Sequence, residues 1–431
     1  MLRREILKSA TFAGMGLLPV GRSGWALAAE PAAPAPRRLI VVFLRGAADG
    51  LSIVVPHADP AYYQARPSIA LGRPGSDGGV LDLDGRFGLH PALEPMMALW
   101  KAGKLGFVHA SGSPDATRSH FDAQDYMESA TPGRKSTQDG WLNRLLGALP
   151  APVGGRVAAT RAVSIGPVLP RIYAGNNQVA NIASGAAATR PTQLDRPAIS
   201  QAFDKLYSAD DRMSRAYQAS QQSRREVMGS MEPNDLEREM VAASNGAPLP
   251  NGFPDDATRL ATLMRNDARV QLAFMAVGGW DTHANQGAAS GQLANRLTPL
   301  GIGLSALASR LGPVFDDTVV VVLSEFGRTV HQNGNGGTDH GHGNVMWLLG
   351  GRIQGGRVYG QWPGLEASAL YEGRDLAVTT DFRLVLAELL ERHLLQPDAR
   401  LAEVFPQFAR SSGQAARAGS GITARGPGLQ H

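Results

Sequence analysis

Apolar runs that end in polar residues recur along the chain. The clearest is residues 39–44, a continuous run that leads into Arg45-Gly46-Ala47-Ala48-Asp49-Gly50. A continuous apolar run of this length is typical of a central strand in a parallel sheet, which is buried on both faces. The same pattern predicts further strands at residues 105–109, 163–165, 272–277, 318–322 and 344–349.

Helical patterns alternate with these strands. Residues 292–311 repeat apolar positions at helical spacing and connect the strand at 272–277 to the strand at 318–322. Strand, helix and strand in this order form a crossover between parallel strands. Further helices are predicted at 257–266, from about Ser119, and at 381–394 with Asp381 as N-cap. We therefore expect an α/β fold, a doubly wound, mostly parallel sheet with helices on both faces and its site at the carboxyl ends of the strands.

The first 28 residues carry targeting signals. An Arg3-Arg4 pair precedes a modest apolar stretch at residues 10–20, and Ala26-Leu27-Ala28 supplies a small-x-small cleavage site. This order is typical of a twin-arginine signal peptide and predicts a periplasmic or secreted protein. An ordinary secretory signal or a retained anchor is the alternative. The apolar stretch is too short to span a bilayer, and no later segment is long enough.

Composition divides the remaining chain. Residues 29–38 are a Pro/Ala linker, and residues 39–410 are expected to form the α/β domain. Within that domain, residues 197–256 are a candidate helical insertion or cap. Residues 197–231 are polar, charged and largely helical in pattern, whereas residues 245–256 are rich in Pro, Gly and Asn, which predicts a loop. Residues 411–431 are rich in Gly, Ala and Ser, which predicts a disordered tail.

Charge and residue usage exclude several function classes. The chain has 431 residues, a formal net charge of +4 and no cysteine. The lack of cysteine excludes disulfides, thiolate zinc sites and a cysteine nucleophile. The small charge, without a basic stripe, argues against nucleic-acid binding. The segment 333–337 lacks the Lys-Ser/Thr of a phosphate-binding loop, and the chain has no Gly-x-Ser-x-Gly elbow of a serine esterase.

Carboxylate and imidazole side chains follow two of the predicted strands. Asp281 and His283 come after one strand, and His340 and His342 come after another. In an extended segment, residues two apart face the same side, so each pair can bind one ion. Such side chains are common ligands of zinc, manganese and iron. The alternatives are a histidine bonded to its neighbouring aspartate without metal, and a solvated polar loop.

Other strand ends carry further candidates. Asp49 ends the first strand, and Glu325 and Arg328 directly follow the strand at 318–322. An aspartate before glycine is common in turns, which is the alternative for Asp49. The shared place of these residues at strand ends favours one common site.

The segment around Ser119 has two compatible interpretations. Ser119 fits the N-cap of a capping box in which Asp122 reaches back. It also fits a nucleophile or an oxyanion-binding hydroxyl, because a helix N-terminus stabilises negative charge. Arg118 beside it could clamp an oxyanion, and Thr117 is a rival for the hydroxyl role.

In chain order, these candidates resemble the site residues of the alkaline phosphatase superfamily. That superfamily places an Asp after its first strand, a Ser or Thr nucleophile at a helix start, and Asp and His ligands after later strands. Several phrases more closely resemble a bacterial family called domain of unknown function 1501, whose members are exported. They are Phe-Leu-Arg-Gly-Ala-Ala-Asp-Gly, Arg-Ser-His-Phe-Asp-Ala-Gln-Asp-Tyr, Gly-Gly-Trp-Asp-Thr-His, Ser-Glu-Phe-Gly-Arg-Thr and Asp-His-Gly-His-Gly. The resemblance spans about residues 39–394 and implies an alkaline phosphatase-like core.

The resemblance also implies one or two divalent metal ions: zinc, manganese, iron or calcium. One ion would take Asp281, His283 and either His340 or His342. The other would take Asp49, Glu325 and the Ser119 oxygen, while Arg45, Arg118 or Arg328 would hold the non-reacting oxygens. Two departures leave a single-metal site open. The chain has Glu325-Phe326 where the superfamily commonly has Asp-His, and its Asp281 and His283 are more closely spaced than in the phosphatases.

Three functions follow from these expectations. The first is an exported metal-dependent hydrolase of phosphate or sulfate esters, on small molecules or polymers. The second is a non-catalytic envelope or binding protein that keeps the fold and a structural or vestigial metal site. The third is hydrolysis of another bond, such as an amide or a phosphonate, at the same metal.

Overall fold

The computed structural model describes residues 17–19, 25–27, 36–150, 159–185, 235–408 and 422. The chain separates into two compact units, Met1–Pro36 and Arg37–His431. In the first unit, β1 (Leu17–Pro19) pairs antiparallel with β2 (Trp25–Leu27). Most of the predicted signal peptide and linker, residues 197–234 of the expected insertion, and the expected tail apart from residue 422 lie outside the described residues.

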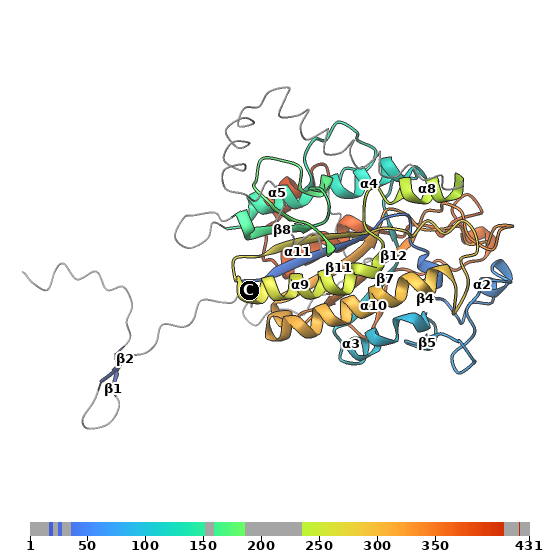
Figure 1. The fold of residues 1–431 in the computed structure, drawn as a ribbon, viewed down its shortest axis with the longest axis horizontal. Helices are drawn as coiled ribbons and strands as arrows, with labels where there is room; N and C mark the ends of the chain where they lie inside the picture. Colours follow the sequence, from blue (N-terminus) through green and yellow to red (C-terminus); the bar gives the residue numbers. More distant parts are fainter. Residues whose placement is uncertain are drawn as a thin grey trace, which may run out of the picture. The chain divides into compact units, whose positions relative to one another are not determined.

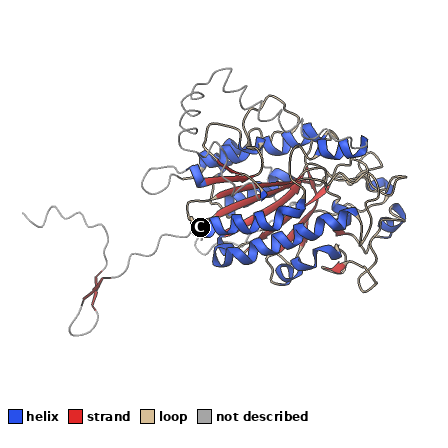
Figure 2. Cartoon of the chain, viewed as in Figure 1, coloured by secondary structure: helices blue, strands red, loops and turns tan. Residues whose placement is uncertain are grey.

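A mixed sheet forms the centre of the second unit (Figures 1 and 2). Its described part has nine strands in the order β13-β7-β12-β11-β3-β10-β8-β9, and β14 also pairs with β7. β12 is antiparallel to both neighbours, and all other pairs are parallel. The strands are β3 (Arg38–Leu44), β7 (Leu105–Gly112), β8 (Ala162–Ile165), β9 (Ala180–Ile182), β10 (Leu272–Val277), β11 (Thr318–Ser324), β12 (Asn344–Gly350), β13 (Val358–Tyr359) and β14 (Thr380–Asp381).

Helices cover both faces of this sheet (Figure 2). Successive strand residues point to opposite faces, so Ile40 and Val42 of β3 pack on one side and Val41 and Phe43 on the other. The first face is covered by α3 (Met97–Lys101), α9 (Phe253–Asn266) and α10 (Gln292–Leu311). The second is covered by α5 (Trp141–Ala148), α11 (Phe382–Arg392) and α12 (Asp398–Val404). This three-layer order confirms the predicted α/β class.

Smaller elements lie next to the carboxyl ends of the strands. A three-stranded antiparallel sheet has the order β4-β6-β5. Its strands are β4 (Val54–Val55), β5 (Leu81–Asp82) and β6 (Gly88–Leu89). The remaining α-helices of the described residues are α1 (Gly50–Ile53), α2 (Pro60–Ala65), α4 (His120–Ser129) and α8 (Asp235–Ala243).

The predicted elements compare closely with the observed ones. The strand at 272–277 and the helix at 292–311 have the predicted bounds, and Asp381 caps α11 by accepting from Arg383 N. The expected loop at 245–256 is wrong in its second half, because α9 begins at Phe253. Pro254 lies in its first turn, where the missing N–H costs no hydrogen bond.

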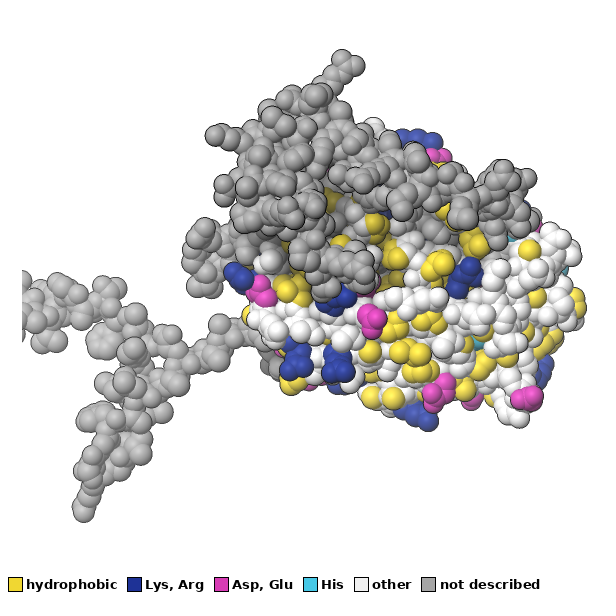
Figure 3. All heavy atoms as spheres, in the orientation of Figure 1, with side chains coloured by type: hydrophobic (Ala, Val, Ile, Leu, Met, Phe, Trp, Pro, Cys, Tyr) yellow, Lys and Arg dark blue, Asp and Glu magenta, His cyan; other side chains and the backbone are white. Residues whose placement is uncertain are grey.

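Charged side chains are scattered on the face that Figure 3 shows, among apolar and neutral atoms. The visible part of this face therefore carries no large field of one sign. Among the described residues, no helix is both long enough and apolar enough to cross a membrane.

Candidate metal centre

The carboxyl ends of several strands meet at one edge of the sheet. Leu44 of β3 pairs in register with Val277 of β10 and with Ser324 of β11. β7 runs in the same direction as β3, because β12 lies antiparallel to both β11 and β7. The loops after β3, β10 and β11, and helix α4 after β7, therefore start at the same edge.

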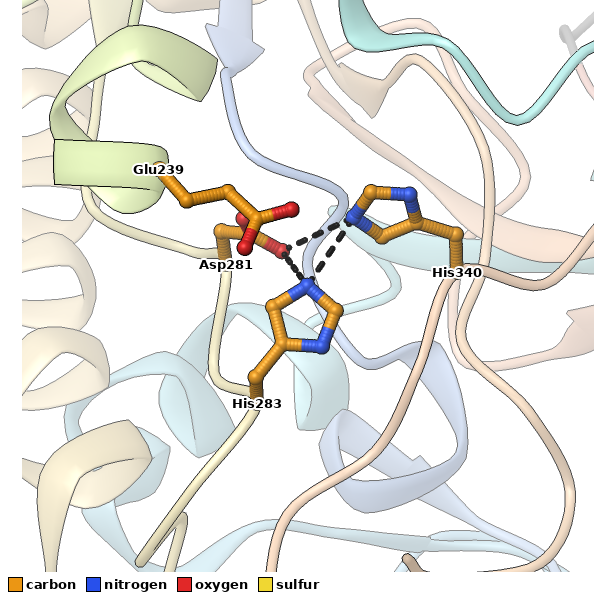
Figure 4. Close-up of side chains that lie close together, drawn as sticks. All are labelled: Glu239, Asp281, His283 and His340. Carbon is orange, nitrogen blue, oxygen red and sulfur yellow. Dashed lines mark hydrogen bonds and ion pairs between the residues drawn. The ribbon is translucent and has the colours of Figure 1, made fainter. Parts of the chain in front are cut away.

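Three imidazoles and one carboxylate converge there, from His120, Asp281, His283 and His340, which we call the His/Asp cluster. His340 Nε2 lies 2.9 Å from His120 Nε2 and 3.0 Å from His283 Nε2. Asp281 Oδ1 lies 2.9 Å from His283 Nε2 and 3.3 Å from His340 Nε2 (Figure 4). Asp281 Oδ2 is buried without a hydrogen-bond partner, 3.5 Å from His120 Nε2. Four ligand atoms of the kind that bind transition metals thus face one small space.

The second nitrogen of each imidazole is held by an acceptor. His120 Nδ1 lies 2.8 Å from Glu325 Oε1, and His283 Nδ1 lies 3.2 Å from Asp339 Oδ1. His340 Nδ1 lies 2.9 Å from the carbonyl oxygen of Arg118, which can only accept. Each Nδ1 therefore carries the proton, and in the neutral imidazoles each Nε2 presents a lone pair. Metal-binding histidines typically donate their second ring N–H to an acceptor in this way, so the residues fit a bound metal ion.

Asp281 is anchored by a fully buried arginine. Arg328 Nη1 donates to Asp281 Oδ1 at 2.5 Å, and the same guanidinium donates to the backbone oxygen and the hydroxyl of Thr338. Burial by itself raises the pKa of Asp281, but the surrounding histidines and Arg328 hold that pKa far below its usual range. Asp281 is therefore an ionised ligand at neutral pH. Arg328 positions it from within the core, where the guanidinium is not free to hold a substrate.

Glu325 lies one layer behind the cluster. Its Oε1 accepts from His120 Nδ1, from Gly46 N at 2.8 Å and from Gln124 Nε2 at 3.0 Å, and Oε2 accepts from Ser324 Oγ at 3.0 Å. Burial opposes ionisation, yet the hydrogen bonds and the charge of His120 lower the pKa of Glu325. For His120 itself, burial is outweighed by the nearby carboxylates of Asp281 and Glu325, which raise its pKa to about 9. Glu325 thus orients a ligand rather than facing the shared space.

A second carboxylate approaches from α8. Ligand atoms of Glu239, Asp281, His283 and His340 all lie within 4.8 Å of one another. Figure 4 shows the Glu239 side chain extending from α8 toward the other three. Glu239 is exposed, whereas Asp281 is buried. The centre therefore combines a buried group of ligands with one carboxylate on the solvent side.

Three of the predicted ligands lie outside the cluster: Glu325, which lies behind His120, and also Asp49 and His342. Both carboxylate oxygens of Asp49 are bonded to Arg66, at 2.6 and 3.1 Å, and Gln286 Nε2 donates to it at 2.8 Å. His342 Nε2 lies 3.0 Å from the carbonyl oxygen of Ser113. The structure therefore brings together Asp281, His283 and His340 of the predicted set, and it places Asp49 in a buried ion pair.

The predicted Ser119 is the N-cap of α4, where its hydroxyl accepts from Asp122 N. Asp122 pairs with Lys135 at 2.9 Å, so the expected capping box forms only in one direction. The Arg118 guanidinium is bonded to Glu372 at 2.6 Å and to Asp375 at 2.7 Å. Ser119 is thus an exposed hydroxyl next to a cluster histidine, while Arg118 is already paired with two carboxylates.

His120 was not among the predicted ligands. It stands in the quoted phrase Arg-Ser-His-Phe-Asp, but the sequence around it has the pattern of a helix start. The feature that could have identified His120 as a ligand is its position directly after the Ser119 N-cap, as the first residue of α4. Its side chain faces inward, whereas its neighbour Phe121 is 62% exposed.

The chain belongs to the family described as "Protein of unknown function (DUF1501)", whose model matches residues 86–403. This confirms the family resemblance noted from the sequence. No curated protein matches the chain.

Several solved structures are similar to the chain at low identity. One is a protein in the alkaline phosphatase superfamily from Vibrio parahaemolyticus, with 10% identity and a TM-score of 0.36 over 80% of this chain and 65% of that one. Another is the C-terminal periplasmic domain of EcEptC from Escherichia coli in complex with Zn, with 10% identity and a TM-score of 0.35 over 74% and 73%. A third is the lipoteichoic acid synthase LtaP from Listeria monocytogenes, with 10% identity and a TM-score of 0.31 over 77% and 68%. The chain thus spans just under two thirds of the first of these.

Proposed function

We propose that this protein is a metal-dependent hydrolase of phosphate or sulfate esters with one divalent metal ion in the His/Asp cluster. The observation that carries the proposal is the convergence of three imidazole Nε2 atoms and the Asp281 carboxylate. Three imidazoles favour zinc, manganese or iron over calcium, which prefers oxygen ligands. A cation held there supplies Lewis-acid stabilisation of the charge that develops on an ester oxygen.

One ion rather than two is the arrangement that the residues support. The second predicted ion would need Asp49 and Glu325 as ligands. Arg66 occupies both oxygens of Asp49, and Glu325 is fully buried among four donors. We therefore assign Glu325 to the orientation of His120 and leave Asp49 out of the ligand set.

We assign the nucleophilic role to the Ser119 hydroxyl, with Thr117 as its rival. Ser119 is exposed, and it is the N-cap of α4, whose first residue is His120. Free N–H groups and the positive end of the helix dipole favour an ionised oxygen at this position. Thr117 Oγ1 accepts from Ser119 N at 3.3 Å, which leaves its own hydroxyl hydrogen available to a different partner.

One observation favours the non-catalytic alternative. The three arginines predicted to hold the non-reacting oxygens are each paired with carboxylates: Arg328 with Asp281, Arg118 with Glu372 and Asp375, and Arg45 with Glu128. An anionic ester would then rely on the metal and on the α4 N-terminus for its binding. A protein of this family that binds metal without turnover would have the same contacts.

Elemental analysis of the purified full chain, beside an Asp281→Ala/His283→Ala variant, tests the metal centre. We expect about one equivalent of zinc, manganese or iron in the wild type and its loss in the variant. A metal-free, folded wild type would refute the centre. Ser119→Ala should keep the metal and lose turnover across a panel of phosphate and sulfate esters. Metal binding without turnover in the wild type would support the non-catalytic alternative.

We also propose export through the twin-arginine route, which the Arg3-Arg4 pair and the Ala26-Leu27-Ala28 site support. Replacing both arginines by lysine should leave the uncleaved chain in the cytoplasm of an expressing bacterium. Unchanged export of that variant would favour an ordinary secretory signal.

A further inference from the structure

Glu239 differs from the other side chains around the His/Asp cluster in how it is held. The cluster imidazoles are each fixed at Nδ1, and Asp281 is fixed by Arg328. Within the part of the chain that the structure describes, Glu239 has neither a hydrogen bond nor an ion pair to hold its carboxylate, and it is exposed. It nevertheless lies within 4.8 Å of three ligand atoms (Figure 4).

The helix that carries Glu239 is attached to the core one turn further on. The Ala243 carbonyl oxygen accepts from Gln124 Nε2 at 2.7 Å, and Gly279 N donates to Ser244 Oγ at 3.0 Å. Gln124 also donates to Glu325, which orients His120. The backbone near Glu239 is thus tied to the metal centre, whereas its side chain is free to swing on its own rotatable bonds.

We propose that Glu239 is an exchangeable ligand: its carboxylate binds the metal ion at rest and leaves when the anionic group of an ester takes its place. This inference rests on the proposed metal centre. A free glutamate side chain loses about 1.5–2 kcal/mol of conformational entropy when it is immobilised, so it is a weaker ligand than the anchored ones. Phosphate or sulfate oxygens offer the same negative charge and the same donor atom to the ion.

A Glu239→Gln variant of the full chain, loaded with cobalt(II) or zinc, tests the exchange. Gln keeps the length of the side chain but removes its charge. Inorganic phosphate is the probe, with its affinity measured by calorimetry and the cobalt absorption spectrum as a second readout. If the wild-type carboxylate occupies its position nine-tenths of the time, phosphate affinity rises about tenfold in the variant. The spectrum changes before phosphate is added, and metal affinity falls by no more than about tenfold. Glu403→Gln, an exposed glutamate of α12, is the matched control and should change nothing.

The outcomes separate this inference from the metal centre beneath it. If the wild type and Glu239→Gln both lack metal, the proposed centre fails and the exchange fails with it. If both bind metal with the same spectrum and the same phosphate affinity, only the exchange is refuted. A variant that loses metal as completely as Asp281→Ala would make Glu239 a fixed ligand, and weaker phosphate binding would make it a phosphate-positioning group. Either result overturns the exchange.

Discussion

Replacing Glu325 by Gln tests whether the layer behind the His/Asp cluster controls metal binding. In the structure, the Glu325 carboxylate holds His120 Nδ1 at 2.8 Å. Gln can keep its Oε1 as an acceptor for His120 and Gly46, and its new amide N–H₂ faces Ser324 Oγ, which can accept. The substitution therefore removes the negative charge while it preserves shape and most hydrogen bonds.

The expected effect is a loss of metal affinity. Partners of metal-bound histidines typically contribute about 10–100-fold to affinity, because they orient the ring and increase its basicity. Gln keeps the orientation of His120 and loses only the negative charge. We therefore expect metal affinity to fall by the lower end of this range, about tenfold or about 1.4 kcal/mol. Competition with a chromophoric chelator at constant pH measures the dissociation constant directly.

Glu128→Gln is the matched control. Glu128 is also a buried glutamate, paired with Arg45 at 2.5 Å and accepting from Ile172 N at 2.8 Å, but it does not contact the cluster. Removing the charge of Glu128 breaks a buried ion pair, which typically costs about 3–5 kcal/mol of unfolding free energy. We expect metal affinity to stay unchanged in this variant. The reasoning is refuted if Glu325→Gln binds metal as tightly as the wild type, or if Glu128→Gln loses as much affinity.

Three further predictions concern stability. Arg328→Met removes the guanidinium that pairs with Asp281. In urea denaturation with a chelator present, this should lower the unfolding free energy by about 3–5 kcal/mol. A loss below about 1 kcal/mol would contradict this prediction. Chelation of the wild type should lower its Tm, and metal restored at 100 times its dissociation constant should return about 2.7 kcal/mol; a Tm that ignores both treatments would contradict a bound metal. Burial lowers the pKa of His109 and of His393 to about 4 in the folded protein. Because the unfolded chain protonates first as the pH falls below about 6.5, stability should decline between about pH 6.5 and 4, by up to about 3 kcal/mol for each histidine. In urea titrations at several pH values, His109→Gln and His393→Gln should each reduce the loss of unfolding free energy between about pH 6.5 and 4. An unchanged pH dependence in both variants would contradict this prediction.

The strands of the main sheet were predictable because a strand buried on both faces must be apolar throughout. Leu272–Val277 is such a strand, and its bounds follow from its composition alone. β7 was predicted only as far as His109, whereas it continues through Ser111 to Gly112. These polar residues stay in the buried strand because His109 Nε2 bonds to Val54 O at 2.8 Å and Ser111 Oγ donates to Val108 O at 2.9 Å. Partners so distant in sequence, or so dependent on local geometry, are not visible in a hydrophobic pattern.

The direction of β12 illustrates another limit. Its apolar run predicts a strand but carries no information on which way the strand points. In the structure, residues 325–343 between β11 and β12 contain no helix, and the strand returns antiparallel beside β11. A parallel neighbour would have required a crossover connection, usually helical. The same segment supplies His340, so the unusual connection and the candidate metal site are one feature of the chain.

Asp49 and Asp281 show why strand-end position alone does not identify a ligand. Both are buried aspartates that follow neighbouring strands, and each is bonded to a fully buried arginine. Arg66 reaches both oxygens of Asp49, and Gln286 adds a further donor, so that carboxylate is satisfied by the protein itself. Arg328 reaches only Oδ1 of Asp281, and Oδ2 has no hydrogen-bond partner although it is buried. A buried carboxylate oxygen without a donor is costly, and His120 Nε2 lies 3.5 Å from this one. A metal ion bound among them would give Asp281 Oδ2 and the Nε2 atoms of the cluster a shared partner, which is why we propose Asp281 as a ligand and assign a structural role to Asp49.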